Sequence, residues 1–244
     1  MIIEEQLQIS ETFSFPVIIT IESRRNCRAS IGKKAVNIKI SQWLSREQRD
    51  AQIQYFKNWA IKHLKPKATV IESSLNKIYK HGDWLTVRGQ SFLLHIKETE
   101  RNNYKGKIVP GNIFIEAPIL AQEKEKTEAI RTIVMKTLAN FFYMEIANRL
   151  IELNEQFYKK RITKFSLKYM TTRWGSCTNK GGINISSRLL LAPTDVMDYV
   201  LIHELAHLVH MDHSPAFWNE VSRAMPNYKE KEKWLKENDY NADF

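Results

Sequence analysis

The sequence predicts an α+β protein, and three features support that class. Between about residues 24 and 117, hydrophobic and polar residues alternate in short stretches, as they do in strands with one buried face. From Glu123 to about Lys160 the chain contains neither Gly nor Pro, and hydrophobic residues recur with a helical period. After residue 163, two further strand-like stretches precede a hydrophobic helix. We therefore expect strands and helices to be mixed within the chain.

Length and composition limit the domain organisation. The chain has 244 residues, 43% of them hydrophobic, which is enough for a real core in one large domain or two small ones. Pro118 closes the strand-rich part, so we expect a basic β-rich N-terminal region at 1–117 and a second domain at 118–244. No Gly- or Ser-rich linker separates them, which favours close packing of the two parts.

The sequence favours neither a membrane protein nor a secreted one. No run of 18 hydrophobic residues exists, so the sequence predicts no membrane span. The first residues are acidic and lack the pattern of a secretory signal. The chain has two cysteines, Cys27 and Cys177, far apart in sequence, which is no disulfide framework. We therefore expect a cytoplasmic protein.

The formal net charge of +10 is concentrated in residues 24–67. This segment holds 12 Lys or Arg against Glu47 and Asp50, while the rest of the chain is balanced. One interpretation is a surface that binds nucleic acid or another polyanion, with Trp43, Tyr55 and Trp59 stacking on bases. The other is a solvated basic face that keeps the protein soluble.

The N-terminal region is expected to contain three pairs of strands and one helix. Short strands are expected on either side of residues 32–34, followed by a helix at about 45–64 that Ser45 caps and Pro66 ends. Residues 84–87 and 92–96 form a predicted hairpin, and residues 107–117 form another around Pro110. The Gly- and Pro-free stretch that follows predicts one long helix or two abutting ones. Its carboxylates Glu145 and Glu152 could support a ligand histidine or form ion pairs.

His203 and His207 are the most informative pair of residues in the chain. They lie four apart within a helix that follows Pro193, and Thr194 or Asp195 could cap its start. Residues four apart share one helix face, so both imidazoles can reach one zinc ion. Glu204 lies beside them and could accept a proton from metal-bound water. This is the His-Glu-x-x-His arrangement of zinc hydrolases.

A zinc site of this kind needs a third protein ligand and leaves one position open. His210 and His213 are the near candidates. Ser214-Pro215 predicts the start of a new helix, so the chain turns just before it. Because such a turn lets His213 fold back toward the first helix, we favour His213 over His210 as the third ligand.

A family resemblance rests on several short motifs. They are Arg173-Trp174-Gly175-Ser176-Cys177, Gly182 to Ile185, Leu189 to Pro193, His203 to His207, and His213-Ser214-Pro215-x-Phe217-Trp218. In these motifs the chain resembles the YgjP-like metallopeptidase family, which is related to the SprT-like and WLM-type zinc proteases. The resemblance implies a zincin-like catalytic domain, in which a sheet with an antiparallel edge packs on the motif helix. It also implies His203, His207 and His213 as metal ligands and Glu204 as the base.

These observations together predict a zinc-dependent metallopeptidase with one zinc ion per chain and a peptide or protein substrate. We expect the strand at 183–186 to hold an extended peptide along a free edge. The oxyanion-stabilising residue stays open among His210, Tyr228 and Arg173, and Cys177 is expected to be buried as a small hydrophobic residue. The alternatives are a zinc-dependent phosphohydrolase acting on nucleotides or phosphate esters, and a nucleic-acid-binding protein with a structural zinc. The chain has no Gly-rich phosphate loop of the Walker type, which weakens the first alternative.

Overall fold

The structure is a computed structural model that describes residues 2–32, 35–69, 71–72, 79–119 and 123–238. It divides into two compact units, Met1–Lys77 and Ile78–Phe244. The sequence suggested a boundary near residue 117 instead. The division differs because the strands before Pro118 bury Ile113 and Ile115 in a core that they share with the long helix after it. Their hydrophobic face is therefore covered by the C-terminal unit.

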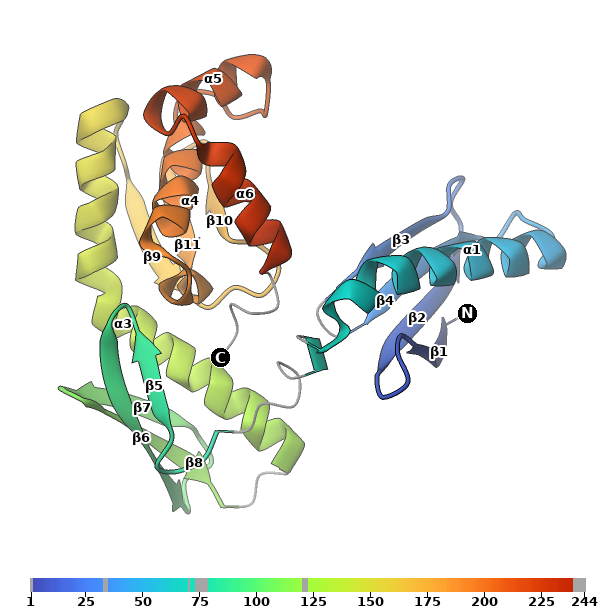
Figure 1. The fold of residues 1–244 in the computed structure, drawn as a ribbon, viewed down its shortest axis with the longest axis horizontal. Coiled ribbons are helices and arrows are strands. Elements are labelled where there is room, and N and C mark those ends of the chain that lie inside the picture. Colours follow the sequence, from blue (N-terminus) through green and yellow to red (C-terminus); the bar gives the residue numbers. More distant parts are fainter. Residues whose placement is uncertain (1, 33–34, 70, 73–78, 120–122, 239–244) are drawn as a thin grey trace. The chain divides into compact units, whose positions relative to one another are not determined.

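The N-terminal unit is a four-stranded sheet with one long helix (Figure 1). Its strands are β1 (Ile2–Gln8), β2 (Ser14–Glu22), β3 (Arg28–Ile31) and β4 (Val36–Ser41), in the order β1-β2-β4-β3. The helix α1 (Arg46–Leu64) is followed by the 3-10 turn η1 (Lys65–Lys67). Ser45 caps α1 through a capping box with Gln48, as expected. The predicted strands around residue 32 are confirmed, and the connection at residues 33–34 lies outside the described residues.

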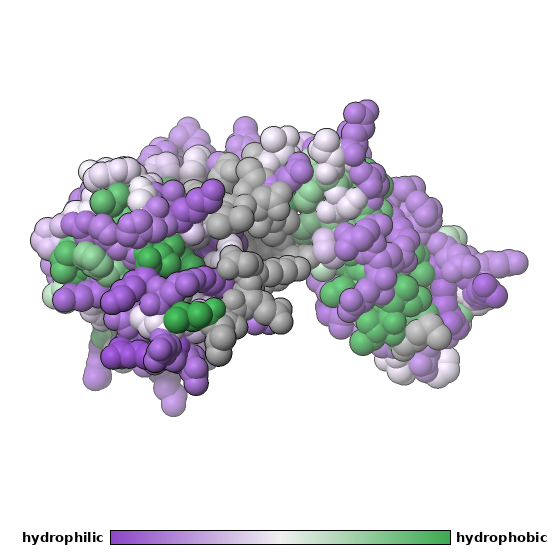
Figure 2. Space-filling view, turned by 90° about the horizontal axis from the view of Figure 1, so that it is seen from below, coloured by the Kyte–Doolittle hydropathy of each residue, from purple (hydrophilic) through white to green (hydrophobic). Residues whose placement is uncertain are grey.

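Part of the basic charge of this unit is used internally. Glu22 forms ion pairs with Arg24 and Lys39, and Lys57 pairs with Glu5. Trp43 and Tyr55 are 71% and 63% exposed. In the right-hand part of Figure 2, hydrophilic residues of this unit surround a hydrophobic patch on the face that is shown. The unit thus presents a mixed surface there.

The C-terminal unit begins with a second four-stranded sheet. Its strands are β5 (Trp84–Val87), β6 (Gln90–Thr99), β7 (Lys105–Val109) and β8 (Asn112–Pro118), in the order β5-β6-β8-β7. Both predicted hairpins are present, since β5 pairs antiparallel with β6 and β7 with β8. No helix in the described part of the chain is long and hydrophobic enough to cross a membrane.

One uninterrupted helix, α3 (Glu123–Phe157), joins this sheet to the rest of the unit. It contacts β7 and β8 and also β9 (Lys164–Lys168), the 3-10 turn η2 (Ser187–Leu191) and α4 (Thr194–Ala206). Figure 1 shows it running from the lower sheet to the helices above. Both carboxylates singled out in the sequence form ion pairs, Glu145 with Arg88 and Glu152 with Arg149. The helix therefore packs against both sheets of the unit and against α4.

The third sheet lies against α4 and has the strand order β10-β11-β9. Its other strands are β10 (Gly175–Cys177) and β11 (Gly182–Ser186). β10 is antiparallel to β11, and β11 is parallel to β9. The predicted α+β fold, with an antiparallel-edged sheet on the motif helix, is confirmed. The predicted free edge at residues 183–186 is wrong, because β11 is the central strand and β10 provides the edge.

Two further helices complete the unit, α5 (Pro215–Ala224) and α6 (Tyr228–Glu237). The predicted side-chain cap of α4 is also wrong. The N-cap position is Pro193, and no side chain caps the helix. Instead, the Asp195 carboxylate lies 2.6 Å from the Lys231 ammonium of α6, so it ties two helices together.

A partly buried ion pair fixes α4 on α3. The Arg149 guanidinium donates from Nε and Nη2 to the two oxygens of Asp198, at 3.0 and 2.7 Å. This bidentate pairing raises the pKa of Arg149 above its ordinary value. Asp198 is buried on α4, five residues before His203.

Replacing Arg149 with alanine should lower the free energy of unfolding by about 1–3 kcal/mol, because Asp198 would then be buried without a partner. Urea denaturation measures the change. Glu152→Gln is the matched control, since Glu152 contacts the same arginine from an exposed position and should cost less than about 1 kcal/mol. Equal stability of Arg149→Ala and the wild type would contradict this role.

Candidate functional site

Three imidazoles converge at the end of α4. His203 lies in the last turn of the helix, and His207 is its C-cap residue. The chain then turns, and Ser214-Pro215 begins α5 as predicted, which brings His213 back over the first two. Nε2 of His213 lies 3.2 Å from Nε2 of His203, and one ligand atom from each of the three lies within 4.8 Å of the others. In the described part of the chain this is the one such group of His, Cys, Asp or Glu.

His210 has a different place in the structure. Its backbone carbonyl lies 3.1 Å from Nδ1 of His207 and can accept a hydrogen bond from it. A proton on Nδ1 leaves Nε2 of His207 with a free lone pair, which is the form that binds a metal. His210 thus orients His207 through the backbone.

A buried phenyl ring supports all three imidazoles. The ring centroid of Phe217, on α5, lies 4.9, 4.5 and 4.8 Å from those of His203, His207 and His213. Phe217 is fully buried. Because α5 follows His213 directly, this packing holds the turn against α4.

Burial favours the neutral form of two of the imidazoles, those of His203 and His207. Burial lowers the pKa of His203 to about 3, and the neighbouring His207 and His213 add to the shift. Burial also lowers the pKa of His207. A metal ligand must be the neutral imidazole, so this environment favours coordination over protonation.

Glu204 is the buried carboxylate of the site. It is 5% exposed, and burial raises its pKa to about 8, although Arg173 opposes the shift. Its Oε2 has no hydrogen-bond partner among the described residues. The side chain reaches β10, where a Cβ on Gly175 would lie 2.4 Å from Glu204 Oε1. Only glycine leaves room for the carboxylate at this point of the strand.

The donor set fits a divalent ion. Two nitrogens bound to one tetrahedral zinc lie about 3.3 Å apart, close to the separation of the His203 and His213 nitrogens. One oxygen of the buried Glu204 carboxylate has no partner among the described residues. Groups of this kind are costly to bury unless something compensates them. Three imidazole nitrogen donors with a carboxylate beside them would hold such an ion and leave a position open.

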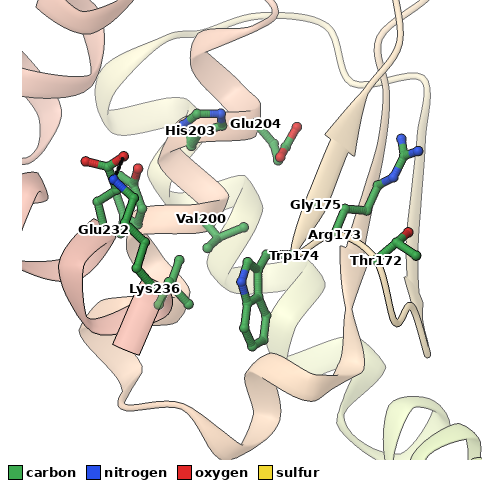
Figure 3. Close-up of a pocket in the computed structure, with 11 residues that line it drawn as sticks. Thr172, Arg173, Trp174, Gly175, Val200, His203, Glu204, Glu232 and Lys236 are labelled. Carbon is green, nitrogen blue, oxygen red and sulfur yellow. Dashed lines mark hydrogen bonds and ion pairs between the residues drawn. The ribbon is translucent and has the colours of Figure 1, made fainter. Parts of the chain in front are cut away.

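A cavity of about 560 Å³ opens on the Glu204 side (Figure 3). His203 and Glu204 come from α4, Glu232 and Lys236 from α6, and Thr172 to Gly175 from the segment that enters β10. Glu232 and Lys236 are ion-paired at 2.7 Å. The Arg188 guanidinium lies 4.1 Å from the Trp174 ring centroid and holds that ring by a cation–π contact. The cavity therefore adjoins the carboxylate and one imidazole.

The candidates for stabilising an oxyanion lie at different distances from the triad. Arg173 lines the cavity, but its side chain points away from His203 in Figure 3. Tyr228 stacks on Trp218 with ring centroids 5.3 Å apart, and Trp218 lies 5.8 Å from His203. The backbone carbonyl of His210 contacts His207. These positions leave the choice open.

Cys177 is half-buried at the end of β10. Burial raises the pKa of its thiol to about 11, and the negative charge of Glu204 acts in the same direction. The neutral thiol therefore behaves as the small hydrophobic group that the sequence suggested.

Two supporting residues were missed by sequence reasoning. Gly175 and Phe217 both lie in the motifs that carry the family resemblance, yet neither was given a role. Phe217 could have been suspected as a hydrophobic residue in the first turn of α5. The contact of Gly175 with Glu204 depends on how the sheet packs against α4, which the sequence does not contain.

Replacing Gly175 with alanine should destabilise the protein by about 1–3 kcal/mol, because Glu204 or β10 must move to admit the methyl group. Thermal or urea unfolding measures the loss. Gly182→Ala is the matched control in the neighbouring strand, where the nearest atom is the Thr178 hydroxyl at 3.1 Å. A Gly175→Ala variant no less stable than Gly182→Ala would contradict the close contact.

Comparison with known proteins places the chain in a family. The sequence profile described as "YgjP-like, metallopeptidase domain" matches residues 25–238. No curated protein matches the chain. Among solved structures, the zymogen of the metallopeptidase abylysin from Pyrococcus abyssi is 26% identical over 38% of this chain and 93% of its own, with a TM-score of 0.35, too low to support further argument. On the strength of the profile match over most of its length, the chain belongs to the YgjP-like metallopeptidase family, whose members are metal-dependent hydrolases.

Proposed function

We propose that this protein is a zinc-dependent metallopeptidase in which His203, His207 and His213 hold the ion and Glu204 transfers the protons. The observation that carries the proposal is the grouping of three imidazole ligand atoms within 4.8 Å of one another. The buried carboxylate of Glu204 directly follows one of these residues, His203, in the helix. The family supports a metal-dependent hydrolase that acts on peptides or proteins. Three imidazole donors suit zinc better than they suit magnesium or calcium, which prefer oxygen ligands.

The residues of the chain divide the chemical work between them. A bound zinc ion supplies Lewis acidity that makes water acidic near neutral pH. Glu204 accepts the proton of the attacking water, since its carboxylate lines the cavity beside the metal ligand His203. The same carboxylate then donates the proton to the leaving amine. His207 keeps its orientation through the His210 carbonyl.

The substrate chain is proposed to lie along β10. This strand is at the edge of its sheet and one of its sides pairs with β11, so its other side has main-chain groups available to an extended peptide. Gly175 in the same strand touches Glu204. A peptide bound there would therefore place a carbonyl near the base.

Replacing His213 with alanine should reduce the zinc content from about one ion per chain to a small fraction of that value, because one of three protein ligands is lost. Elemental analysis after purification without added metal measures it. His210→Ala is the matched control and should keep its zinc, since His210 contributes its backbone carbonyl. The assignment fails if His213→Ala retains the wild-type amount while His210→Ala loses it.

Replacing Glu204 with glutamine should leave zinc content unchanged and lower kcat for peptide hydrolysis by at least about 100-fold, because the amide cannot take up the proton. A quenched fluorescent peptide or a denatured protein substrate provides the assay. Wild-type turnover by the glutamine variant would remove Glu204 from the mechanism.

The other sequence hypotheses receive less support. The phosphohydrolase alternative has no family match behind it, because the matching family is one of metallopeptidases. Binding of a polyanion through residues 24–67 stays a prediction, testable by the salt dependence of DNA binding. A cytoplasmic location also stays a prediction.

A further inference from the structure

A second cavity, of about 550 Å³, opens on the His207 side of the triad. His207, Leu208 and Val209, which directly follow α4, line it, and so does Met211 in the turn. Two other segments complete the wall, one after α3 and one in the turn between β10 and β11. They contribute Lys160, Arg161, Thr163, Thr178, Asn179, Lys180 and Gly181.

The charge of this cavity is one-sided. Lys160, Arg161 and Lys180 line it, and no acidic residue does. Within the described residues, no carboxylate forms an ion pair with any of these three side chains. The cavity beside Glu204 differs, because its Lys236 is neutralised by Glu232. Three like charges around one hollow favour an anionic group inside it.

The backbone that carries these cations is held in place. The buried Asn154 side chain donates to the carbonyl of Lys160 at 2.9 Å and accepts from its amide at 3.1 Å. Thr163 donates from its amide to the Gly181 carbonyl and from its hydroxyl to the Lys180 carbonyl, at 2.9 and 2.7 Å. Gly181 adopts a positive φ of 78°. The two segments are thus pinned to each other before any ligand binds.

The edge strand connects the two cavities. Thr172 to Gly175, which lead into β10, line the first cavity, and Thr178 to Gly181, which follow β10, line the second. A peptide paired with the free side of β10 would therefore extend from one to the other. β10 has three residues, so at about 3.3 Å per residue a few peptide residues span its length.

We propose that the cavity formed by Lys160, Arg161 and Lys180 is a specificity subsite for an acidic side chain of the peptide substrate. This inference rests on the proposed peptidase function and adds the substrate class to it. The apolar side chains of Leu208, Val209 and Met211 contact the methylene groups of a Glu side chain, while the three cations bind its carboxylate. A peptide explains the cavity better than a nucleotide does, because the cavity lies at the end of a free strand edge and the family acts on peptides.

The test uses blocked octapeptides that differ by one Glu or Gln at each position, bound to the zinc-loaded Glu204→Gln variant of the full chain. We expect the Glu peptide to bind at least 5-fold more tightly than the Gln peptide at one position, with the difference shrinking as salt is added. Adding Arg161→Glu and Lys180→Glu should abolish the preference for Glu. A peptide with Lys at the same position should then bind more tightly than the Gln peptide. Lys105→Glu together with Lys107→Glu is the matched control, since this pair makes the same change of four charge units on β7, outside both cavities.

Each failure has a distinct outcome. Equal binding of Glu and Gln peptides at every position would overturn the acidic subsite. So would a preference that survives the charge reversal, or inorganic phosphate binding at the site with no peptide discrimination. If the expected discrimination is found but the wild type cleaves none of the bound peptides, the proposed peptidase function fails while the subsite stands.

Discussion

Helix α4 carries ionisable groups into a hydrophobic core, and the rest of the site depends on that burial. His203 and Glu204 lie among Leu201, Leu205 and Phe217, which are fully buried. Burial makes the charged form of each group unfavourable, and one oxygen of Glu204 has no partner among the described residues. A metal ion would compensate this cost, so the same packing that weakens the metal-free protein favours metal binding.

The supporting structure serves this arrangement from several sides. Arg149 fixes α3 to α4 through Asp198, and Lys231 of α6 pairs with Asp195 in the first turn of α4. Phe217 supports the imidazoles from α5. β10 approaches so closely that only glycine fits beside Glu204. Rigid elements therefore hold the candidate base and ligands, and the substrate-facing residues come from the segments on either side of β10.

The local parts of this structure could be predicted from the sequence. The four-residue spacing of His203 and His207 determines that they share a helix face, and Ser214-Pro215 marks the new helix that returns His213. Periodicity and turn residues located the strands β3 to β9 and β11 and the long helix α3, whereas β1, β2 and β10 were not predicted. The order of strands in a sheet depends on pairing between distant segments, so the central position of β11 was not predictable. The same reason applies to the boundary near residue 77, because the sequence does not say which helix covers β8.

Recognition of the substrate emerges from the structure alone. Lys160, Arg161 and Lys180 are separated by up to twenty residues in the sequence and form no motif. They come together because Thr163 bonds to the carbonyls of Lys180 and Gly181, while Asn154 fixes the backbone of Lys160. A charge count over the whole chain pointed to residues 24–67 instead. Three cations of that segment, Arg24, Lys39 and Lys57, pair with the carboxylates of Glu22 and Glu5, which lie outside it.

The most direct test of the account is to determine the ligands of the metal in the zinc-loaded protein by anomalous X-ray diffraction. We expect one ion bound by the ring nitrogens of His203, His207 and His213 at about 2.0–2.1 Å, with Glu204 outside the coordination shell and one position left open. An ion held by Glu204 itself, by His210 in place of His213, or by a carboxylate from elsewhere in the chain would contradict the proposed centre.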